Sequence, residues 1–290
     1  MIRVTKLIFG CGYLGQRVAE RWLRQGDTVY ALTRSAARAR SLQAAGLRAL
    51  VGEIQQPAML RDLPVADTVL FAVGYERGSP GSMRDVYVDG LRHVLQALPP
   101  GTGRLIYVSS TGVYGQADGS WVDESSRCEP TRAGGAACWE AERLLLGSSW
   151  AEQAIVLRMS GLYGPGRIPR RRELEAGRPL AAPPTGFLNL VHVADAARAV
   201  LAVARDAPLP QVYCVSDGQP VVRGEYYRYL AELLGAPAPI FIEPPADSPA
   251  ALRAGASKRV SSARFCQRFA FRFEYSSYRE GLAAAVAAER

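Results

Sequence analysis

The pattern of apolar and polar positions changes period repeatedly along the first half of the chain. Short apolar runs rich in β-branched residues are followed by segments with helical spacing, an alternation typical of βαβ units and a parallel sheet. We therefore expect an α/β fold built on a doubly wound parallel sheet. The predicted strands cover residues 4–9, 28–33, 47–51, 68–73, 104–109 and 154–158, with helices between most of them.

The second half of the chain has a different texture. Beyond residue 161 come loops rich in Gly, Pro and Arg, then apolar segments at 191–203 and 211–215 and helical segments at 223–234 and 278–288. The change predicts a sheet domain over residues 1–160. Residues 161–290 are expected to form a smaller substrate lobe, interleaved with the last elements of the sheet domain.

Composition narrows the class of protein. Apolar residues make up 48% of the 290, yet no stretch reaches the roughly 18 residues that span a bilayer, and no secretory leader is visible. We therefore expect a soluble, cytoplasmic protein without a membrane partner. The net charge of +8 comes from scattered arginines that form no stripe with aromatic residues, which argues against a nucleic-acid partner. Five cysteines without a C-x-x-C pair, and only two histidines, predict reduced thiols and no metal site.

A glycine loop follows the first predicted strand directly. Gly10-Cys11-Gly12-Tyr13-Leu14-Gly15 has the spacing G-x-G-x-x-G and opens a helical segment. In such a loop the first glycine permits a tight turn, the second lets the backbone approach a pyrophosphate, and the third lets the helix pack on the strand. The helix dipole then faces the phosphates. This context predicts a Rossmann fold that binds a nicotinamide dinucleotide.

The end of the second strand bears on the choice of cofactor. An NAD-preferring site usually carries Asp or Glu there for the ribose hydroxyls, whereas this chain has Arg34, with Arg38 one turn further on. A cation at this place can pair with a 2′-phosphate, so NADP is the expected cofactor in preference to NAD. Arginines that are merely solvated are the alternative.

Several ordered motifs resemble those of the extended short-chain dehydrogenases/reductases of the NAD-dependent epimerase/dehydratase group. Besides the glycine loop they are V-G-E-I at 51–54, Y-V-S-S-T-G-V-Y-G at 107–115, L-R-M-S-G-L-Y-G-P-G at 157–166 and V-H-V-A-D at 191–195. Together with the glycine loop and the second strand, the resemblance implies cofactor contacts from Gly10, Gly12, Tyr13, Leu14, Gly15, Thr33, Arg34, Arg38, Glu53, Ile54, Ala72, Val73, Gly74, Ser109, Met159, Ser160 and Gly161. It also makes a homodimer an option, by analogy alone.

The family's usual catalytic pattern is broken. Ser110 stands where the family has its serine, but the Y-x-x-x-K pair would fall on Gly134 and Cys138. Alignment error does not explain the loss, because the two lysines of the chain, Lys6 and Lys258, have Ile2 and Ala254 four residues before them. In the family that lysine and the nicotinium charge make a tyrosine with an ordinary pKa of about 10 into a useful proton relay. The chain therefore resembles the atypical members that keep the cofactor fold and lose catalytic residues.

Other groups could replace this pair. Tyr163 and His192 are candidate catalytic residues beside Ser110, although both residue types more often position loops or satisfy hydrogen bonds. A cluster of arginines could bind an anionic substrate such as a nucleotide sugar. The equally weighted alternative is a solvated face balanced by Glu173 and Glu175. The arginines are Arg167, Arg170, Arg171, Arg172 and Arg178.

Two functions remain open from the sequence. The first is an NAD(P)-dependent oxidoreductase or epimerase-like enzyme with a non-standard active site and an unknown small-molecule substrate. The second is a catalytically silent NADP(H)-binding sensor or regulatory protein, which the missing tyrosine and lysine favour. The breadth of the family resemblance favours the enzyme.

Overall fold

The structure, a computed structural model, describes residues 4–76, 78, 81–209, 211–246 and 248–289. The chain forms two compact units that interleave along the sequence. Unit 1 comprises Met1–Ser110, Ala133–Arg158 and Ala197–Val212, and unit 2 comprises Thr111–Arg132, Met159–Ala196 and Tyr213–Arg290. Unit 2 thus begins directly after Ser110 and includes a loop segment well before residue 161.

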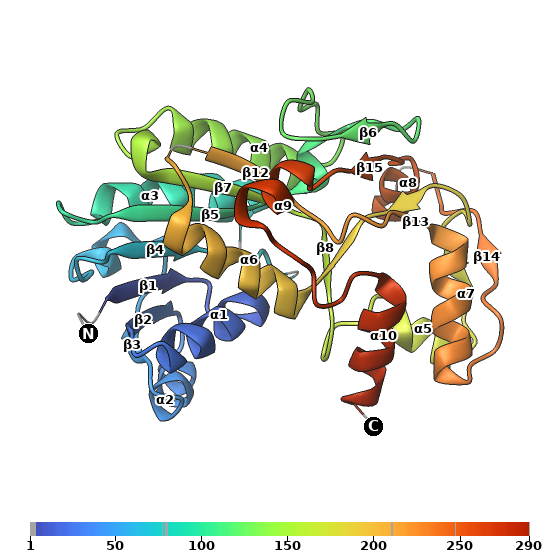
Figure 1. The fold of residues 1–290 in the computed structure, drawn as a ribbon, viewed down its shortest axis with the longest axis horizontal. Helices are drawn as coiled ribbons and strands as arrows, with labels where there is room; N and C mark the ends of the chain where they lie inside the picture. Colours follow the sequence, from blue (N-terminus) through green and yellow to red (C-terminus); the bar gives the residue numbers. More distant parts are fainter. Residues whose placement is uncertain (1–3, 77, 79–80, 210, 247, 290) are drawn as a thin grey trace. The chain divides into compact units, whose positions relative to one another are not determined.

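A seven-stranded parallel sheet is the framework of unit 1, and it confirms the predicted α/β fold (Figure 1). Its strand order is β12-β7-β5-β4-β1-β2-β3, so the chain winds outward from β1 in both directions. The strands β7 and β12 run on into unit 2 at their carboxyl ends. The strands are β1 (Thr5–Phe9), β2 (Thr28–Thr33), β3 (Arg48–Val51), β4 (Thr68–Phe71), β5 (Arg104–Ser110), β7 (Ala154–Met159) and β12 (Gln211–Val215).

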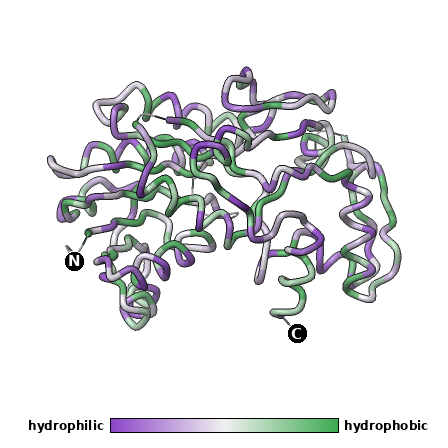
Figure 2. The backbone as a smooth tube through the Cα atoms, viewed as in Figure 1, coloured by the Kyte–Doolittle hydropathy of each residue, from purple (hydrophilic) through white to green (hydrophobic). Residues whose placement is uncertain are grey.

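Helices cover both faces of this sheet, with α3 and α4 on one face and α1 on the other (Figure 1). Figure 2 shows hydrophobic positions gathered along the strands, as expected where a sheet is covered on both sides. Short helical turns (η1, η2 and η4) link the elements. The bounds are α1 (Tyr13–Arg24), α2 (Ala36–Ala44), η1 (Pro57–Leu60), η2 (Asp85–Asp89), α3 (Gly90–Ala97), α4 (Ala133–Leu146), η4 (Ala151–Gln153) and α6 (Val193–Asp206), of which α6 begins in unit 2.

Alternate side chains of the strands build the core beneath α3 and α4. Phe9, Phe71 and Tyr107, from three neighbouring strands, form a row of ring contacts with centroids 6.3 and 5.8 Å apart. Leu91 of α3 and Leu145 of α4 are fully buried in the same cluster. Because strand side chains alternate between faces, the intervening residues of each strand face the opposite layer of helices.

A polar network is buried within unit 1. Glu142 of α4 is fully buried and receives two hydrogen bonds from the Arg158 Nε, at 3.2 and 3.1 Å, and one from its Nη2 at 2.7 Å. The Ser109 hydroxyl donates to the same carboxylate. An ion pair that is both buried and hydrogen-bonded in this way is strongly destabilised when one partner is removed.

Unit 2 contains short strand pairs and a helical core rich in aromatic side chains. Tyr226 of α7 lies 5.8 Å from Tyr278 of α10 between ring centroids, and Leu230 and Leu282 are fully buried beside them. The bounds are η3 (Thr111–Val113), β6 (Trp121–Val122), β8 (Gly161–Tyr163), α5 (Arg171–Glu175), β9 (Leu180–Ala181), β10 (Phe187–Leu188), β11 (Leu190–His192), β13 (Val221–Val222), α7 (Arg223–Leu234), β14 (Phe241–Ile242), α8 (Pro249–Ala254), β15 (Arg259–Val260), α9 (Ala263–Phe269) and α10 (Tyr278–Ala287). In the part of the chain that the structure describes, no helix is both long enough and apolar enough to cross a membrane.

The buried pair of unit 1 gives a stability prediction. Replacing Glu142 with Leu leaves the Arg158 guanidinium buried without its carboxylate, and we expect the free energy of unfolding to fall by about 3–5 kcal/mol. Urea unfolding measures the change. The control is Glu140→Leu in the same helix, which removes an exposed partner of Arg84 and should cost about 1 kcal/mol or less. Equal losses in the two variants would contradict the assigned role of the pair.

Candidate functional site

The glycine loop of unit 1 is shaped by two very close backbone approaches. Gly10 has φ of +89°, and a Cβ added there would lie 2.5 Å from the backbone of Ala72 and Val73. A Cβ on Gly15 would lie 2.4 Å from the Gly10 carbonyl oxygen. Among the described residues, no heavy atom other than those of its chain neighbours lies within 4 Å of the Cβ position of Gly12, so the middle glycine faces open space. These are the three roles that the sequence motif predicts.

Helix α1 begins directly at this open position. Its N-cap is Gly12, which has no side chain to accept from the first backbone N–H groups, and its first turn carries no acidic residue. The uncapped N–H groups and the helix dipole therefore favour an anion. Burial raises the pKa of the Cys11 thiol to about 11, so this side chain adds no negative charge to the loop at neutral pH.

Helix α2, which follows β2, brings an arginine to the glycine loop. The Arg38 Nη2 donates to the carbonyl oxygen of Cys11 at 3.4 Å, while the hydroxyl of Ser35 caps α2 by accepting from the Arg38 N–H at 3.2 Å. Arg34 forms an exposed ion pair with Glu76 at 3.0 Å. Arg38 therefore contacts the glycine loop, and Arg34, at the end of β2, has an exposed carboxylate as its partner.

The other residues expected to contact the cofactor in unit 1 lie at the carboxyl ends of neighbouring strands. The Gly52 N–H donates to the Thr33 carbonyl oxygen at 2.9 Å, which joins the ends of β2 and β3. The Ala72 N–H donates to the Phe9 carbonyl oxygen at 2.8 Å. After these contacts Gly74 again faces open space. In a doubly wound sheet this edge is where ligands bind.

Two more predicted residues follow β3. The carbonyl oxygen of Ile54 lies 2.9 Å from Nδ1 of His93, and its side chain packs closely against Gly90. Glu53 accepts a hydrogen bond from the Gln56 amide at 3.0 Å in an exposed turn. The segment is thus held in place by α3.

The serines at the end of β5 have different surroundings. The Ser109 side chain is buried and bonded to Glu142, whereas Ser110, the last residue of the strand, is half-buried. On α4, burial and the Glu142 carboxylate raise the pKa of the Cys138 thiol to about 12, so the thiol stays protonated. The only cysteine on this helix therefore offers no thiolate nucleophile near neutral pH.

In unit 2 the segment 159–161 is tied to neighbouring strands through its backbone. The Ser160 N–H donates to the Val215 carbonyl oxygen and the Gly161 N–H to that of Asn189, both at 2.9 Å. Met159 and Ser160 are buried, and Gly161 is exposed.

Tyr163 and His192 lie side by side in the core of unit 2. Their ring centroids are 5.4 Å apart, and the imidazole also packs on Tyr275 at 3.8 Å. Tyr163 is fully buried, and its hydroxyl donates to the Ser277 carbonyl oxygen at 3.5 Å. Burial, with Asp217 as the next cause, raises the pKa of this phenol above its ordinary range. The tyrosine therefore holds its proton tightly, and its ring packs beneath α10.

Two of the clustered arginines in unit 2 are engaged by carboxylates. Arg170 pairs with Glu173 and Arg171 with Glu175, each at 2.7 Å, and Arg171 also pairs with Glu289 near the end of the chain. The balancing carboxylates named from the sequence thus form ion pairs here.

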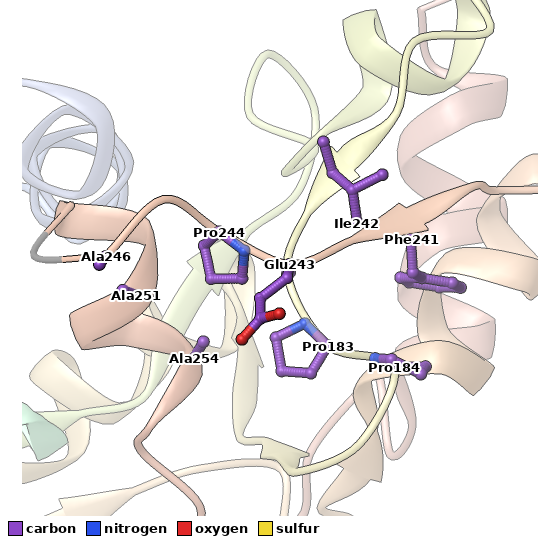
Figure 3. A pocket seen from close by; sticks show the side chains of 10 residues that line it. Pro183, Pro184, Phe241, Ile242, Glu243, Pro244, Ala246, Ala251 and Ala254 are labelled. Atoms are coloured by element: carbon purple, nitrogen blue, oxygen red, sulfur yellow. The ribbon is translucent and has the colours of Figure 1, made fainter.

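A pocket of about 930 Å³ in unit 2 was not anticipated from the sequence. Figure 3 shows the Glu243 carboxylate beside Pro183 and Pro244, among otherwise apolar side chains. The signal that could have indicated it is the proline-rich segment 235–249, which supplies one wall. The lining residues are Ala182, Pro183, Pro184, Phe241, Ile242, Glu243, Pro244, Ala246, Ala251 and Ala254.

The fold and the glycine loop define an NAD-binding protein of the Rossmann class. The sequence profile of the NAD dependent epimerase/dehydratase family matches residues 7–216, well over half of the chain. The chain belongs to this family.

Individual relatives are identical to this chain at just over a quarter of the aligned positions. Protein YeeZ of Escherichia coli (strain K12) is 28% identical over 211 residues, 72% of each chain. A 4-hydroxy-2-methyl-3-oxo-4-farnesyl-3,4-dihydroquinoline-1-oxide ketoreductase of Stigmatella aurantiaca is 27% identical over 253 residues, 80% of this chain and 73% of the relative.

Solved structures give the same picture at the level of the fold. A Methylobacillus flagellatus protein, provisionally described as an NAD-dependent epimerase/dehydratase, is 29% identical, with 99% of each chain covered and a TM-score of 0.79. MoeE5 in complex with UDP-glucose and NAD is 23% identical, with 99% of this chain and 98% of that chain covered and a TM-score of 0.78.

The glycine loop yields a matched pair of variants. Gly12→Ala places a methyl group in open space, so we expect an unchanged unfolding midpoint and a dinucleotide dissociation constant raised roughly 10- to 100-fold, because the pyrophosphate can no longer approach the backbone. Gly10→Ala places the methyl group against Ala72 and requires positive φ, so it should lower the midpoint itself. Thermal unfolding and NADPH fluorescence titration measure the two effects. Unimpaired binding by Gly12→Ala would contradict the site.

Proposed function

We propose that this protein is an NADP-preferring oxidoreductase that acts on a carbonyl or alcohol group of a small molecule without the tyrosine–lysine pair of its family. The observation that carries the proposal is the geometry of the glycine loop. A backbone too tight for any side chain at Gly10 and Gly15, but open at Gly12, fits a bound pyrophosphate. Hydride chemistry would be supplied by the bound nicotinamide.

The preference for NADP rests on the two arginines after β2. Arg38 reaches the glycine loop through the Cys11 carbonyl oxygen, and Arg34, four residues earlier in the chain, forms an exposed ion pair with Glu76. Exposed pairs contribute about 1 kcal/mol or less, so a 2′-phosphate can displace Glu76 at small cost. Two guanidinium groups then pair with the phosphate dianion, which NAD lacks.

In the proposed enzyme, a group other than the family's tyrosine–lysine pair has to donate or accept the proton. Tyr163 and His192 are committed to packing in unit 2, and the raised pKa of Tyr163 makes it a poor proton relay. Ser110 is half-buried at the end of β5, and its hydroxyl is suited to hydrogen-bond a substrate oxygen. Its assigned role is to position that oxygen.

The substrate is proposed to be a ketone or a related carbonyl compound. The Stigmatella relative is named as a ketoreductase of a farnesylated quinoline, and the pocket of unit 2 is mostly apolar. A nucleotide sugar is the second class to test, because MoeE5 was solved with UDP-glucose. The pocket's own charged residue, Glu243, would repel a diphosphate there and favours the apolar class.

The cofactor preference is testable by charge reversal. In an Arg34→Asp, Arg38→Gln variant we expect the NADPH dissociation constant to rise by roughly 10- to 100-fold and that for NADH to fall or stay unchanged, because only NADPH loses a phosphate partner. Fluorescence titration of each cofactor gives both values. Arg40→Gln, in the same helix, is the control and should change neither. A wild-type protein that binds NADH more tightly would overturn the NADP assignment.

Turnover separates the enzyme from a silent NADP(H) sensor, the alternative that the missing pair supports. NADPH absorbance is followed with ketones, aldehydes and sugar nucleotides, and we expect oxidation with at least one carbonyl compound. Ser110→Ala should lower kcat/KM roughly 10- to 1000-fold with NADPH binding intact. No transfer of labelled hydride to any substrate, alongside tight NADPH binding, would favour the sensor.

A further inference from the structure

One of the two lysines of the chain is buried in unit 2. Lys258 directly precedes β15 and is only 6% exposed. Its Nζ donates to the carbonyl oxygen of Tyr114 at 2.9 Å, which uses one of the three N–H bonds of an ammonium. No other described residue accepts a hydrogen bond from it.

The position of this lysine is fixed from two sides. The Asn189 amide donates to the Lys258 carbonyl oxygen at 2.9 Å and accepts from the Val260 N–H at 2.7 Å. β15 pairs with β6, and the Gly119 N–H donates to the Ser257 carbonyl oxygen at 2.9 Å. These bonds fix the backbone around Lys258, and the bond to Tyr114 holds its ammonium, so less side-chain entropy remains to be lost when a ligand binds.

A second cation, Arg132, belongs to a segment that packs next to Tyr114 and Gly115. Gly115 is packed so tightly that a Cβ there would lie 1.9 Å from the Glu129 carbonyl oxygen and 3.4 Å from the Thr131 side chain. This contact places the segment that ends in Thr131, and with it the backbone of Arg132, next to Gly115, which follows the tyrosine whose carbonyl receives the lysine. Burial, with the Arg132 guanidinium as the second cause, lowers the pKa of Lys258 to about 8.

The two cations are not compensated within the described residues. Arg132 is half-buried, burial lowers its pKa, and its guanidinium makes no hydrogen bond or ion pair to another described residue. Glu124 and Glu129, which precede Arg132 in the chain, are bonded to other groups. Glu124 accepts from the Cys214 N–H at 2.7 Å and Glu129 pairs with Arg127 at 2.7 Å.

Asp123, the next carboxylate back along the chain, is also bonded to other groups. Asp123 accepts from the hydroxyls of Ser125 and Ser126 at 2.6 and 3.1 Å. Two adjacent desolvated cations are costly unless an anion joins them. An oxyanion could accept from the two remaining N–H groups of Lys258 and from the guanidinium of Arg132 together.

We propose that Lys258 and Arg132 form a binding site for an oxyanion, the carboxylate or phosphate group of the substrate. The inference rests on the proposed function for the identity of the ligand, but the site itself is defined by the two cations. It differs from the arginine cluster of α5, where Glu173, Glu175 and Glu289 already neutralise Arg170 and Arg171.

The scarcity of lysine makes the site directly observable. Protein labelled with ¹⁵N at lysine Nζ has two side-chain signals, from Lys6 and Lys258, and Lys258→Arg identifies which is which. Inorganic phosphate and, separately, acetate are titrated while the pKa of each ammonium is measured. We expect phosphate, acetate or both to raise the Lys258 pKa from about 8 to roughly 9 or above, because a bound anion favours the charged form. The ion with the larger effect distinguishes phosphate from carboxylate.

Matched variants test the second cation. Arg132→Gln should weaken the binding of the effective anion at least ~10-fold, whereas Arg127→Gln, which removes an exposed arginine five residues earlier, should not change it. Lys6, bonded to Thr68 in unit 1, serves as the internal control in every sample. Unfolding midpoints verify that each variant is folded.

Three outcomes would overturn the proposal. The first is a Lys258 signal that moves with neither ion until Lys6 also moves. The second is equal binding by the Arg132→Gln variant. The third is a Lys258 shift that NADP⁺ alone saturates, which would assign the anion to the cofactor. None of these measurements requires turnover, so failure of the proposed enzymatic activity remains a separate result.

Discussion

The close approach of Gly10 to the backbone between Ala72 and Val73 is the constraint on which unit 1 depends. A side chain at Gly10 would have its Cβ 2.5 Å from that backbone, so the ends of β1 and β4 can meet only around a glycine. β1 and β4 are also the strands at which the order of the sheet reverses, since β2 and β3 lie on one side and β5 on the other. The crevice of a doubly wound sheet opens at this point. The same steric requirement at Gly10 therefore sets how closely β1 and β4 approach each other and places the start of α1 at the crevice.

The sheet was predictable from the sequence because its strands are buried on both faces. Continuous apolar runs such as Thr68–Phe71, in which all four residues are buried, stand out without any knowledge of partners. The segment 211–215 also stood out, but its place beside β7 depends on a pairing across more than fifty residues that no local pattern encodes. The same limit applies to the arginine cluster. Glu173 and Glu175 were visible as local partners, whereas Glu289, 118 residues from Arg171, was not.

Lys258 shows what a sequence leaves out about a site. From the sequence, we could say only that Lys258 is not the lysine of a Y-x-x-x-K pair, because no tyrosine stands four residues before it. Its burial results from contacts to Tyr114 and Asn189, which lie far away in the sequence. Desolvation and a neighbouring guanidinium then change its acidity, and neither follows from residue type alone. The acidity of this residue is therefore a property of its packing.

The chain has no Y-x-x-x-K motif, and the positions of helix α4 that the family resemblance assigns to that pair have other surroundings. The face that would carry the pair has Gly134 and Cys138, and the thiol of Cys138 is buried against Tyr107. One turn further on, the Glu142 carboxylate accepts hydrogen bonds from Arg158 and from the Ser109 hydroxyl. Cys138 and Glu142, the polar groups of α4 that face the core of unit 1, are thus engaged with β5 and β7, whereas Glu140 is exposed and paired with Arg84. The same buried contacts hold β5 and β7 of the sheet against this helix, and the acid–base groups of the proposed enzyme would have to come from other segments.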